Sequence, residues 1–208
     1  MNKIKSFLQK IIVAVLVGCI FFIQGSVGLA ATAGPTFVGP RMNLPKGAPS
    51  AYGFWSFAIL DGGKISRSGQ PLMSEFKWLK KNGWKSVVNL RTDGEYKEIG
   101  DDKKLVGFKD LGFNYLSLPI RDGGVPTINQ AKQFLKFVTD SANQPVEVHC
   151  RGGYGRTGTL IALYRYTVNG WTMKQAIAES RLYRGGIDSQ QEKWLLKWEK
   201  NNPPTKGM

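Results

Sequence analysis

Histidine and cysteine are nearly absent from this chain, which has one histidine and two cysteines among 208 residues. Zinc sites draw three or four ligands mostly from these two residue types, so a zinc centre is excluded. We therefore expect neither a metal nor a cofactor. If the segment that holds Cys19 is cut away or lipidated, Cys150 remains as the only thiol, and no internal disulfide can form.

Acidic residues are also few. Fifteen Asp and Glu stand against 29 Lys and Arg, which gives a formal net charge of +14 and a pI near 9.8. Such a surface attracts anions, and the sequence leaves open whether it is an ordinary solvated face or draws in a polyanionic substrate. The basic residues are scattered and are not interleaved with aromatic ones, so we expect no nucleic-acid partner.

Long apolar runs are missing except near the N-terminus, where a basic stretch precedes a nearly continuous apolar one and small residues follow. This order predicts an export signal over residues 1–33, cleaved after Ala30 or Ala33. Two alternatives stay open, namely lipidation at Cys19 and retention of residues 11–33 as a membrane anchor. All three put the rest of the chain outside the cytoplasm, in the periplasm or the extracellular space.

Composition divides the rest of the chain into three parts. Residues 34–53 are rich in Pro and Gly and predict an extended tether, residues 54–202 carry strand and helix patterns, and residues 203–208 form a short tail. Hydrophobic residues make up 42% of the chain, enough for one domain with a sizeable core. Alternating strands and helices predict a single α/β domain with a mostly parallel central sheet flanked by helices.

The elements of that domain can be read from periodicity. Short β-branched runs predict strands at residues 64–67, 85–90, 113–120 and 145–149. Apolar residues at helical spacing predict helices at residues 74–82, 101–111, 127–142, 157–169, 172–184 and 189–201. Trp194 and Trp198 stand one turn apart on the last of these helices, and we interpret them as core packing, not as a ligand cage.

One glycine-rich stretch is the most informative, because residues 149–159 read His-Cys-Arg-Gly-Gly-Tyr-Gly-Arg-Thr-Gly-Thr. It joins the end of a predicted strand to the start of a predicted helix. Backbone N–H groups at a helix N-terminus lack intrahelical partners and carry the positive end of the helix dipole, so a turn that wraps them around a dianion would bind phosphate. The residues that we expect in this phosphate cradle are Arg151, Gly152, Gly153, Tyr154, Gly155 and Arg156.

Four side chains of this stretch have a predicted chemical role. The helix N-terminus and Arg156 would favour the thiolate form of Cys150, which is a nucleophile near neutral pH. Arg156 would also bind two phosphate oxygens with its planar guanidinium, which lysine does poorly. Thr157 offers a hydroxyl within reach of the sulfur. His149 would hydrogen-bond the loop and help to set the thiolate.

The stretch resembles the His-Cys-x-x-Gly-x-x-Arg-Ser/Thr signature of the protein tyrosine phosphatase superfamily, and its five fixed places are filled by His149, Cys150, Gly153, Arg156 and Thr157. Further segments resemble the compact, dual-specificity-like branch, namely residues 66–71, 87–91 and 118–120. The resemblance covers residues 55–200. It implies a cysteine phosphatase of the phosphotyrosine or dual-specificity type, which hydrolyses phosphate monoesters through a phosphocysteine intermediate. Together with the predicted export signal, this indicates an exported bacterial member.

The same resemblance implies a general acid. Family members have an aspartate, on a loop at this place in the chain order, that protonates the leaving alcohol and then takes a proton from the attacking water. Here that residue is Asp122, and Gly123 and Gly124 would let its loop close over a substrate. Topology agrees, because Asp122 and Cys150 would follow the C-terminal ends of two parallel strands that open at one sheet edge. Asp93 is the second choice, and a polar helix face is assigned to Asp101, Asp102 and Asp110.

Other functions fit parts of the pattern. Residues 153–158 also match the dinucleotide motif Gly-x-Gly-x-x-Gly, which we reject because the segment where an acidic strand end should follow reads as a helix. A Walker-type loop fails, since no Gly-Lys-Ser/Thr follows. Arg151 and Arg121 leave an inositol polyphosphate or phosphoinositide substrate open beside a phosphoprotein. The alternative from another class is an inactive phosphate-binding module, which would not need a nucleophile or an acid.

Overall fold

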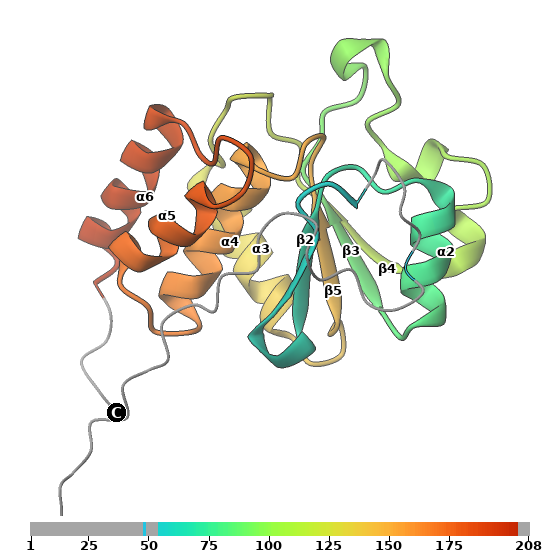
Figure 1. The fold of residues 1–208 in the computed structure, drawn as a ribbon, viewed down its shortest axis with the longest axis horizontal. Helices are drawn as coiled ribbons and strands as arrows, with labels where there is room; N and C mark the ends of the chain where they lie inside the picture. The colour runs from blue at the N-terminus through green and yellow to red at the C-terminus, as the bar shows by residue number, and fades with distance from the viewer. Residues whose placement is uncertain (1–47, 49–53, 204–208) are drawn as a thin grey trace, which may run out of the picture. The chain divides into compact units, whose positions relative to one another are not determined.

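Residue 48 and residues 54–203 are described by the computed structural model of the protein, whose ribbon is drawn in Figure 1. The predicted export signal lies outside the described residues, as do nearly all of the predicted tether and tail. Those predictions therefore stand as made. Within the described residues, no helix combines the length and the apolar character that crossing a membrane requires.

A five-stranded sheet forms the centre of the described domain. Its spatial order is β1 (Ala58–Leu60), β2 (Ile65–Ser68), β5 (Val146–His149), β3 (Ser86–Asn89) and β4 (Asn114–Ser117). β1 pairs antiparallel with β2, and every other pairing in the sheet is parallel. The predicted α/β fold with a mostly parallel sheet is therefore confirmed.

Strands β2, β5 and β3 are buried along their whole length. Parallel strands that are covered on both faces need apolar side chains on both, which explains the adjacent Val87 and Val88 in β3. In the register of the sheet, His149 at the end of β5 stands beside Ser68 of β2 and Asn89 of β3. The segments that follow these three strands therefore begin at one edge of the sheet.

Helices cover both faces of this sheet (Figure 1). One side carries α3 (Ile128–Thr139), α4 (Gly155–Thr167), α5 (Met173–Arg181) and α6 (Ser189–Asn201), and the other carries α2 (Met73–Lys81). Two hydrophobic clusters match the two sides, the larger around α4 and the smaller around Phe76 and Leu79 of α2. In α6, Trp198 is buried and its ring stacks on that of Trp194, which confirms their prediction as core packing.

The predicted helix at residues 101–111 is wrong. The structure has two short 3-10 helices there, η4 (Asp102–Lys104) and η5 (Lys109–Leu111). Gly107 between them has a φ of 81°, a left-handed conformation that interrupts a right-handed helix. Asp102 is buried, where it contacts His149 and Gln70, so its predicted place on a polar helix face is wrong.

The other predicted elements are present with shifted ends. β4 and α3 are shorter than predicted, α5 ends at Arg181, and α4 begins at Gly155, two residues earlier than predicted. Thr127 caps α3, because its hydroxyl accepts a hydrogen bond from the N–H of Gln130 at 3.1 Å.

Candidate active site

The loop between β5 and α4, residues 150–154, folds around the sulfur of Cys150. The N–H of Gly153 donates to Cys150 Sγ at 3.3 Å. Gly153 has a φ of 76°, and a Cβ atom built there would lie 2.4 Å from the backbone nitrogen of Gly69. Both the left-handed conformation and the close approach to the end of β2 therefore require glycine at position 153.

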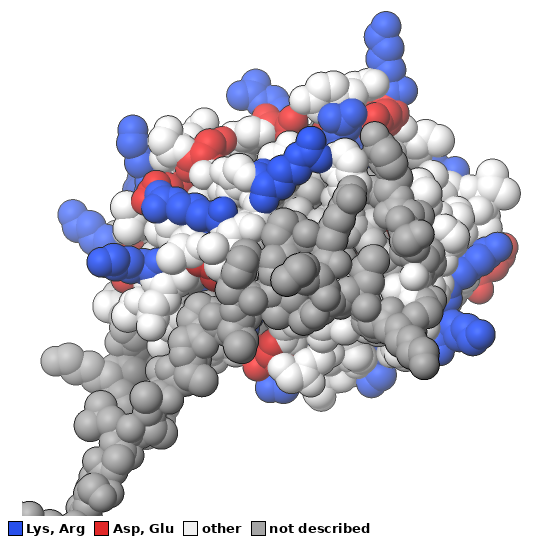
Figure 2. All heavy atoms as spheres, viewed as in Figure 1, with Lys and Arg blue, Asp and Glu red and all other residues white. Residues whose placement is uncertain are grey.

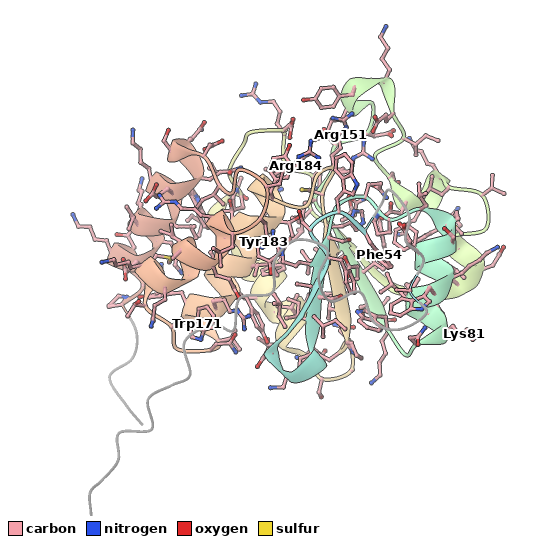
Figure 3. All side chains as sticks on the ribbon, in the orientation of Figure 1. Phe54, Lys81, Arg151, Trp171, Tyr183 and Arg184 are labelled. Atoms are coloured by element: carbon pink, nitrogen blue, oxygen red, sulfur yellow. The ribbon has the colours of Figure 1, made fainter. Side chains whose placement is uncertain are left out.

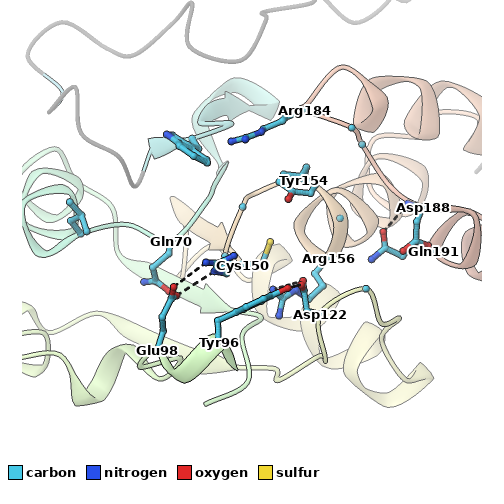
Figure 4. A pocket seen from close by; sticks show the side chains of 18 residues that line it. Gln70, Tyr96, Glu98, Asp122, Cys150, Tyr154, Arg156, Arg184, Asp188 and Gln191 are labelled. Atoms are coloured by element: carbon cyan, nitrogen blue, oxygen red, sulfur yellow. Dashed lines mark hydrogen bonds and ion pairs between the residues drawn. The ribbon is translucent and has the colours of Figure 1, made fainter. Parts of the chain in front are cut away.

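Helix α4 follows this loop and fixes it in the core, since residues 156–166 are all buried. The first N–H groups of a helix have no intrahelical partner, so the positive end of α4 faces the loop. Cys150 is only 3% exposed, but it lines a cavity of about 800 Å³ together with Arg156 and Asp122 (Figure 4). The structure thus brings the predicted nucleophile, arginine and acid to one cavity.

The guanidinium of Arg156 is held by Glu95, a residue of the short helix η3 (Glu95–Lys97) that sequence reasoning missed. Nη1 and Nη2 donate to the two Glu95 carboxylate oxygens at 2.6 and 2.8 Å, and Nη1 also donates to the carbonyl of Ile120 at 3.0 Å. Burial alone would raise the pKa of Glu95, but the hydrogen bonds and charge of Arg156 outweigh burial and lower it. The fork predicted for phosphate is therefore taken by Glu95 on its Nη1–Nη2 side. Phosphate oxygens would have to bind on the Nε–Nη2 side, although Asp122 Oδ1 lies 3.0 Å from Nη2.

Asp122 lies on the loop that follows β4, beside the same guanidinium. Its Oδ1 atom is 3.0 Å from Arg156 Nη2, and its Oδ2 atom accepts a hydrogen bond from the Tyr96 hydroxyl at 2.7 Å. The Asp122 side chain is 47% exposed, so it can exchange protons with solvent. Gln191 of α6 donates to the carbonyl of Gly124 at 3.1 Å and ties this loop to the domain.

Asp93, the second choice for the acid, is engaged elsewhere. Its carboxylate pairs with Lys104 and accepts a hydrogen bond from the N–H of Gly100 at 3.2 Å. The hydrogen bond from Lys104 is the main cause that lowers the pKa of Asp93. Asp93 is also not among the residues that line the cavity, which favours Asp122 on geometry.

His149 is fully buried behind the loop and pairs with Asp102, a partner that the sequence did not predict. Nε2 of His149 lies 2.8 Å from Asp102 Oδ2, and Nδ1 lies 3.4 Å from the carbonyl oxygen of Cys150. Asp102 Oδ1 accepts a second hydrogen bond, from Gln70 Nε2 at 2.8 Å. The predicted contact of His149 with the loop is therefore made to the backbone of Cys150, and a buried carboxylate orients the ring.

Thr157 is in the first turn of α4, as predicted. Its hydroxyl oxygen is buried and has no hydrogen-bond partner among the residues that the structure describes. The hydroxyl is therefore not hydrogen-bonded to the Cys150 sulfur, and the role of Thr157 stays a prediction.

The remaining predicted cradle residues, Arg151, Gly152, Tyr154 and Gly155, also line the cavity. The Arg151 guanidinium pairs with Glu98 at 3.1 Å and lies over the Tyr96 ring at 4.1 Å. Arg151 therefore forms part of the cavity wall, with its charge offset by Glu98.

Comparison with known proteins gives one matching family and several similar folds. The model of a family described as DSP-PTPase phosphatase fused to NAD+ Kinase matches residues 60–197. The chain is 34% identical over 132 residues to the dual specificity protein phosphatase CDC14A of Mus musculus, which covers 62% of this chain and 20% of that protein. The chain thus spans about a fifth of the length of this relative.

Two solved structures are similar over most of their length. The crystal structure of Tk-PTP in the active form is 26% identical, with a TM-score of 0.56, over 67% of this chain and 92% of that one. PTPMT1 in complex with PI(5)P is 22% identical, with a TM-score of 0.59, over 70% of this chain and 95% of that one. The second likeness shows the fold alone.

Proposed function

The chain belongs to the family described as DSP-PTPase phosphatase fused to NAD+ Kinase, and on this premise we propose that it is a cysteine-dependent phosphatase that hydrolyses phosphate monoesters. The observation that carries the proposal is the cavity in which Cys150, Arg156 and Asp122 meet. A module that only bound phosphate would need the loop N–H groups and the arginine. It would gain nothing from a nucleophile with an acid beside it.

In the first step, the Cys150 thiolate attacks phosphorus and forms an S–P bond as the P–O bond to the leaving group breaks. Asp122, in its acid form, gives its proton to the departing oxygen, so that a neutral alcohol leaves. The loop N–H groups and the Nε–Nη2 side of Arg156 stabilise the charge on the other three oxygens. The acid starts close to the phosphoryl site, since its Oδ1 atom lies 3.0 Å from Nη2 of that arginine.

In the second step, water attacks the phosphorus of the phosphocysteine, and the S–P bond breaks to return the thiolate of Cys150. The Asp122 carboxylate accepts the proton that the water loses, and inorganic phosphate leaves. The two steps share one set of donors, because the same three phosphoryl oxygens stay in the cradle throughout.

We expect the protein to hydrolyse an aryl phosphate with a chelator present, since none of these steps uses a metal. Rapid acid quenching of the wild type with a 32P-labelled substrate should trap label on Cys150, seen as a single labelled peptide. A protein that binds phosphate but shows neither turnover nor labelled peptide would be the inactive binding module instead.

A second candidate substrate class, one that carries several phosphates, is favoured by Arg184. This residue lies between α5 and α6, lines the cavity, and its guanidinium lies over the Trp55 ring at 4.4 Å (Figure 4). Arg151 lies at the same end of the domain (Figure 3). On the face drawn in Figure 2, basic side chains are interspersed with acidic and other ones. We therefore assign recognition of a second phosphate to the cavity wall, which Arg151 and Arg184 help to line.

Arg184→Ala should lower kcat/KM for inositol hexakisphosphate by about 10-fold, the effect of one lost charge-assisted contact, and leave phosphotyrosine peptide nearly unchanged. The matched control is Arg181→Ala, because Arg181 pairs with Glu192 at 2.6 Å and does not line the cavity. Steady-state kinetics on the two substrates decide. Equal losses on both, or none on either, would remove the multiply phosphorylated class.

We also propose that the protein is exported, with cleavage after Ala30 or Ala33. The support is the order of basic, apolar and small residues in residues 1–33. N-terminal sequencing of the protein from its own host decides between cleavage at these sites, a lipidated Cys19 and a retained membrane anchor. An intact N-terminus on protein from the cytoplasm would refute export.

A further inference from the structure

Arg67 is a second arginine close to the Cys150 loop, and it is completely buried. It lies on β2, where it pairs in register with Ala58 of β1 and Val148 of β5, and its exposed fraction is 0%. A charged side chain in the middle of a sheet costs free energy unless something compensates it. Its contacts point to the loop.

The Arg67 guanidinium makes one hydrogen bond to a backbone carbonyl and one contact with an aromatic ring. Nη2 donates a hydrogen bond to the carbonyl of Gly153, and the Cζ atom lies over the Tyr183 ring, 3.6 Å from its centre. Figure 3 shows Tyr183 on the α5 side of the sheet, near β2. Nε and Nη1 have no hydrogen-bond partner among the described residues. The group is therefore oriented by one loop carbonyl and one aromatic face.

No carboxylate among the described residues is hydrogen-bonded to Arg67. The nearby Glu179 is engaged by Arg165, whose Nε and Nη2 donate to it at 3.0 and 2.7 Å. Glu147 accepts hydrogen bonds from Ser66 and Ser68, and burial raises its pKa to about 7, so at neutral pH it carries only part of a charge. Arg67 therefore has no hydrogen-bonded carboxylate among the described residues, although the charges of Glu179 and Glu147 still act on it.

The hydrogen bond to Gly153 sets the direction of the loop peptides. Because a trans peptide is planar, the carbonyl of Gly153 and the N–H of Tyr154 point in opposite directions. Holding that carbonyl against Arg67 turns the N–H of Tyr154 away from Arg67. The N–H of Gly153 itself donates to Cys150 Sγ at 3.3 Å. One buried side chain therefore fixes the Gly153–Tyr154 peptide, which follows directly on the peptide that donates to the sulfur.

The charge of Arg67 also acts on the sulfur. Burial is the main cause that lowers the pKa of the Arg67 guanidinium, and a negative charge on Cys150 is among the causes that oppose it. Such an interaction is reciprocal, so a cation at Arg67 favours an anion at Cys150.

We propose that Arg67 is a positioning residue of the Cys150 loop. Its hydrogen bond to the carbonyl of Gly153 fixes the orientation of the loop, and its charge favours the thiolate form of Cys150. The inference rests on the proposed function only for its effect on turnover. The effect on the sulfur can be measured without any catalysis.

Two variants isolate the effect of the charge. Arg67→Lys keeps both the charge and a hydrogen-bond donor, and Arg67→Gln keeps a donor but loses the charge. The readout is the pH midpoint of Cys150 alkylation by iodoacetamide, with folding checked by circular dichroism. We expect the midpoint to rise by about one pH unit in Arg67→Gln and to stay near the wild type in Arg67→Lys. Turnover of aryl phosphate at pH 6 should fall about 10-fold in Arg67→Gln and recover in part in Arg67→Lys.

Ile65→Val is the matched control, because Ile65 is buried on the same strand and carries no charge. It should lower thermal stability without moving the alkylation midpoint. An unmoved midpoint in folded Arg67→Gln overturns the proposal, as does an equal rise in the lysine and glutamine variants. If the midpoint moves as expected in a protein that has no turnover, the proposed function fails while the role of Arg67 stands.

Discussion

Cys150→Ser should lose at least about 10⁴-fold in kcat on aryl phosphate while it still binds inorganic phosphate. A serine hydroxyl stays protonated near neutral pH, so it does not attack phosphorus and no covalent intermediate forms. The cradle is left intact, because the donors that face the substrate are backbone N–H groups and Arg156. The measurement is steady-state turnover in the presence of EDTA, beside phosphate binding by calorimetry.

The control for this variant is Ser68→Ala. Ser68 is buried at the end of β2, and its hydroxyl donates to Glu147, so the change leaves the sulfur in place. It should keep most of the turnover. Turnover in Cys150→Ser equal to that of Ser68→Ala would show that the hydrolysis does not pass through the sulfur, and the proposed mechanism would be lost.

Asp122→Asn should lower kcat by about 10²- to 10⁴-fold on substrates with a poor leaving group, the range for loss of a general acid. Phosphotyrosine fits this case, whereas p-nitrophenyl phosphate should lose less because its leaving group needs little protonation. Affinity for phosphate should stay the same or improve, because the Asp122 carboxylate no longer lies 3.0 Å from Arg156 Nη2.

The pH profile gives an independent test of the same role. In the wild type, kcat/KM should rise with pH as the thiolate forms and fall once Asp122 has lost its proton. Asp122→Asn should keep the rise and lose the fall. Asp93→Asn is the matched control, since Asp93 pairs with Lys104 outside the cavity, and it should keep both limbs. Equal profiles for the two variants would remove Asp122 from the acid role.

The parts of the site that local sequence determines were predicted correctly in position. Residues 149–157 follow a buried strand and open a helix, and glycine at position 153 is required by the backbone conformation, so local pattern and position in space agree. The α/β fold could also be predicted from local pattern, because an alternation of strands and helices is compatible with only a few topologies.

The partners of these residues could not be predicted, because they come from distant parts of the chain. Glu95 is 61 residues from Arg156, and Asp102 is 47 residues from His149. Both lie in short 3-10 helices, η3 and η4, which local pattern does not identify. Residues 101–111 show why, because their apolar positions imitate a helix that Gly107 interrupts with its left-handed backbone. No local signal distinguishes an acidic residue that faces solvent from one that meets a buried cation.

The short helix η3 has a consequence for how substrate and protein respond to each other. Glu95 pairs with Arg156, Tyr96 donates to Asp122, and Glu98 pairs with Arg151. Tyr96 is 60% exposed, so the turn is held in place mainly by these polar contacts and less by hydrophobic packing. Coupling of this kind is reciprocal. A phosphate that competes with Glu95 for Arg156, and with Glu98 for Arg151, therefore weakens the contacts that hold the turn. A molecule that binds the turn from outside changes, in return, how firmly the two arginines are held.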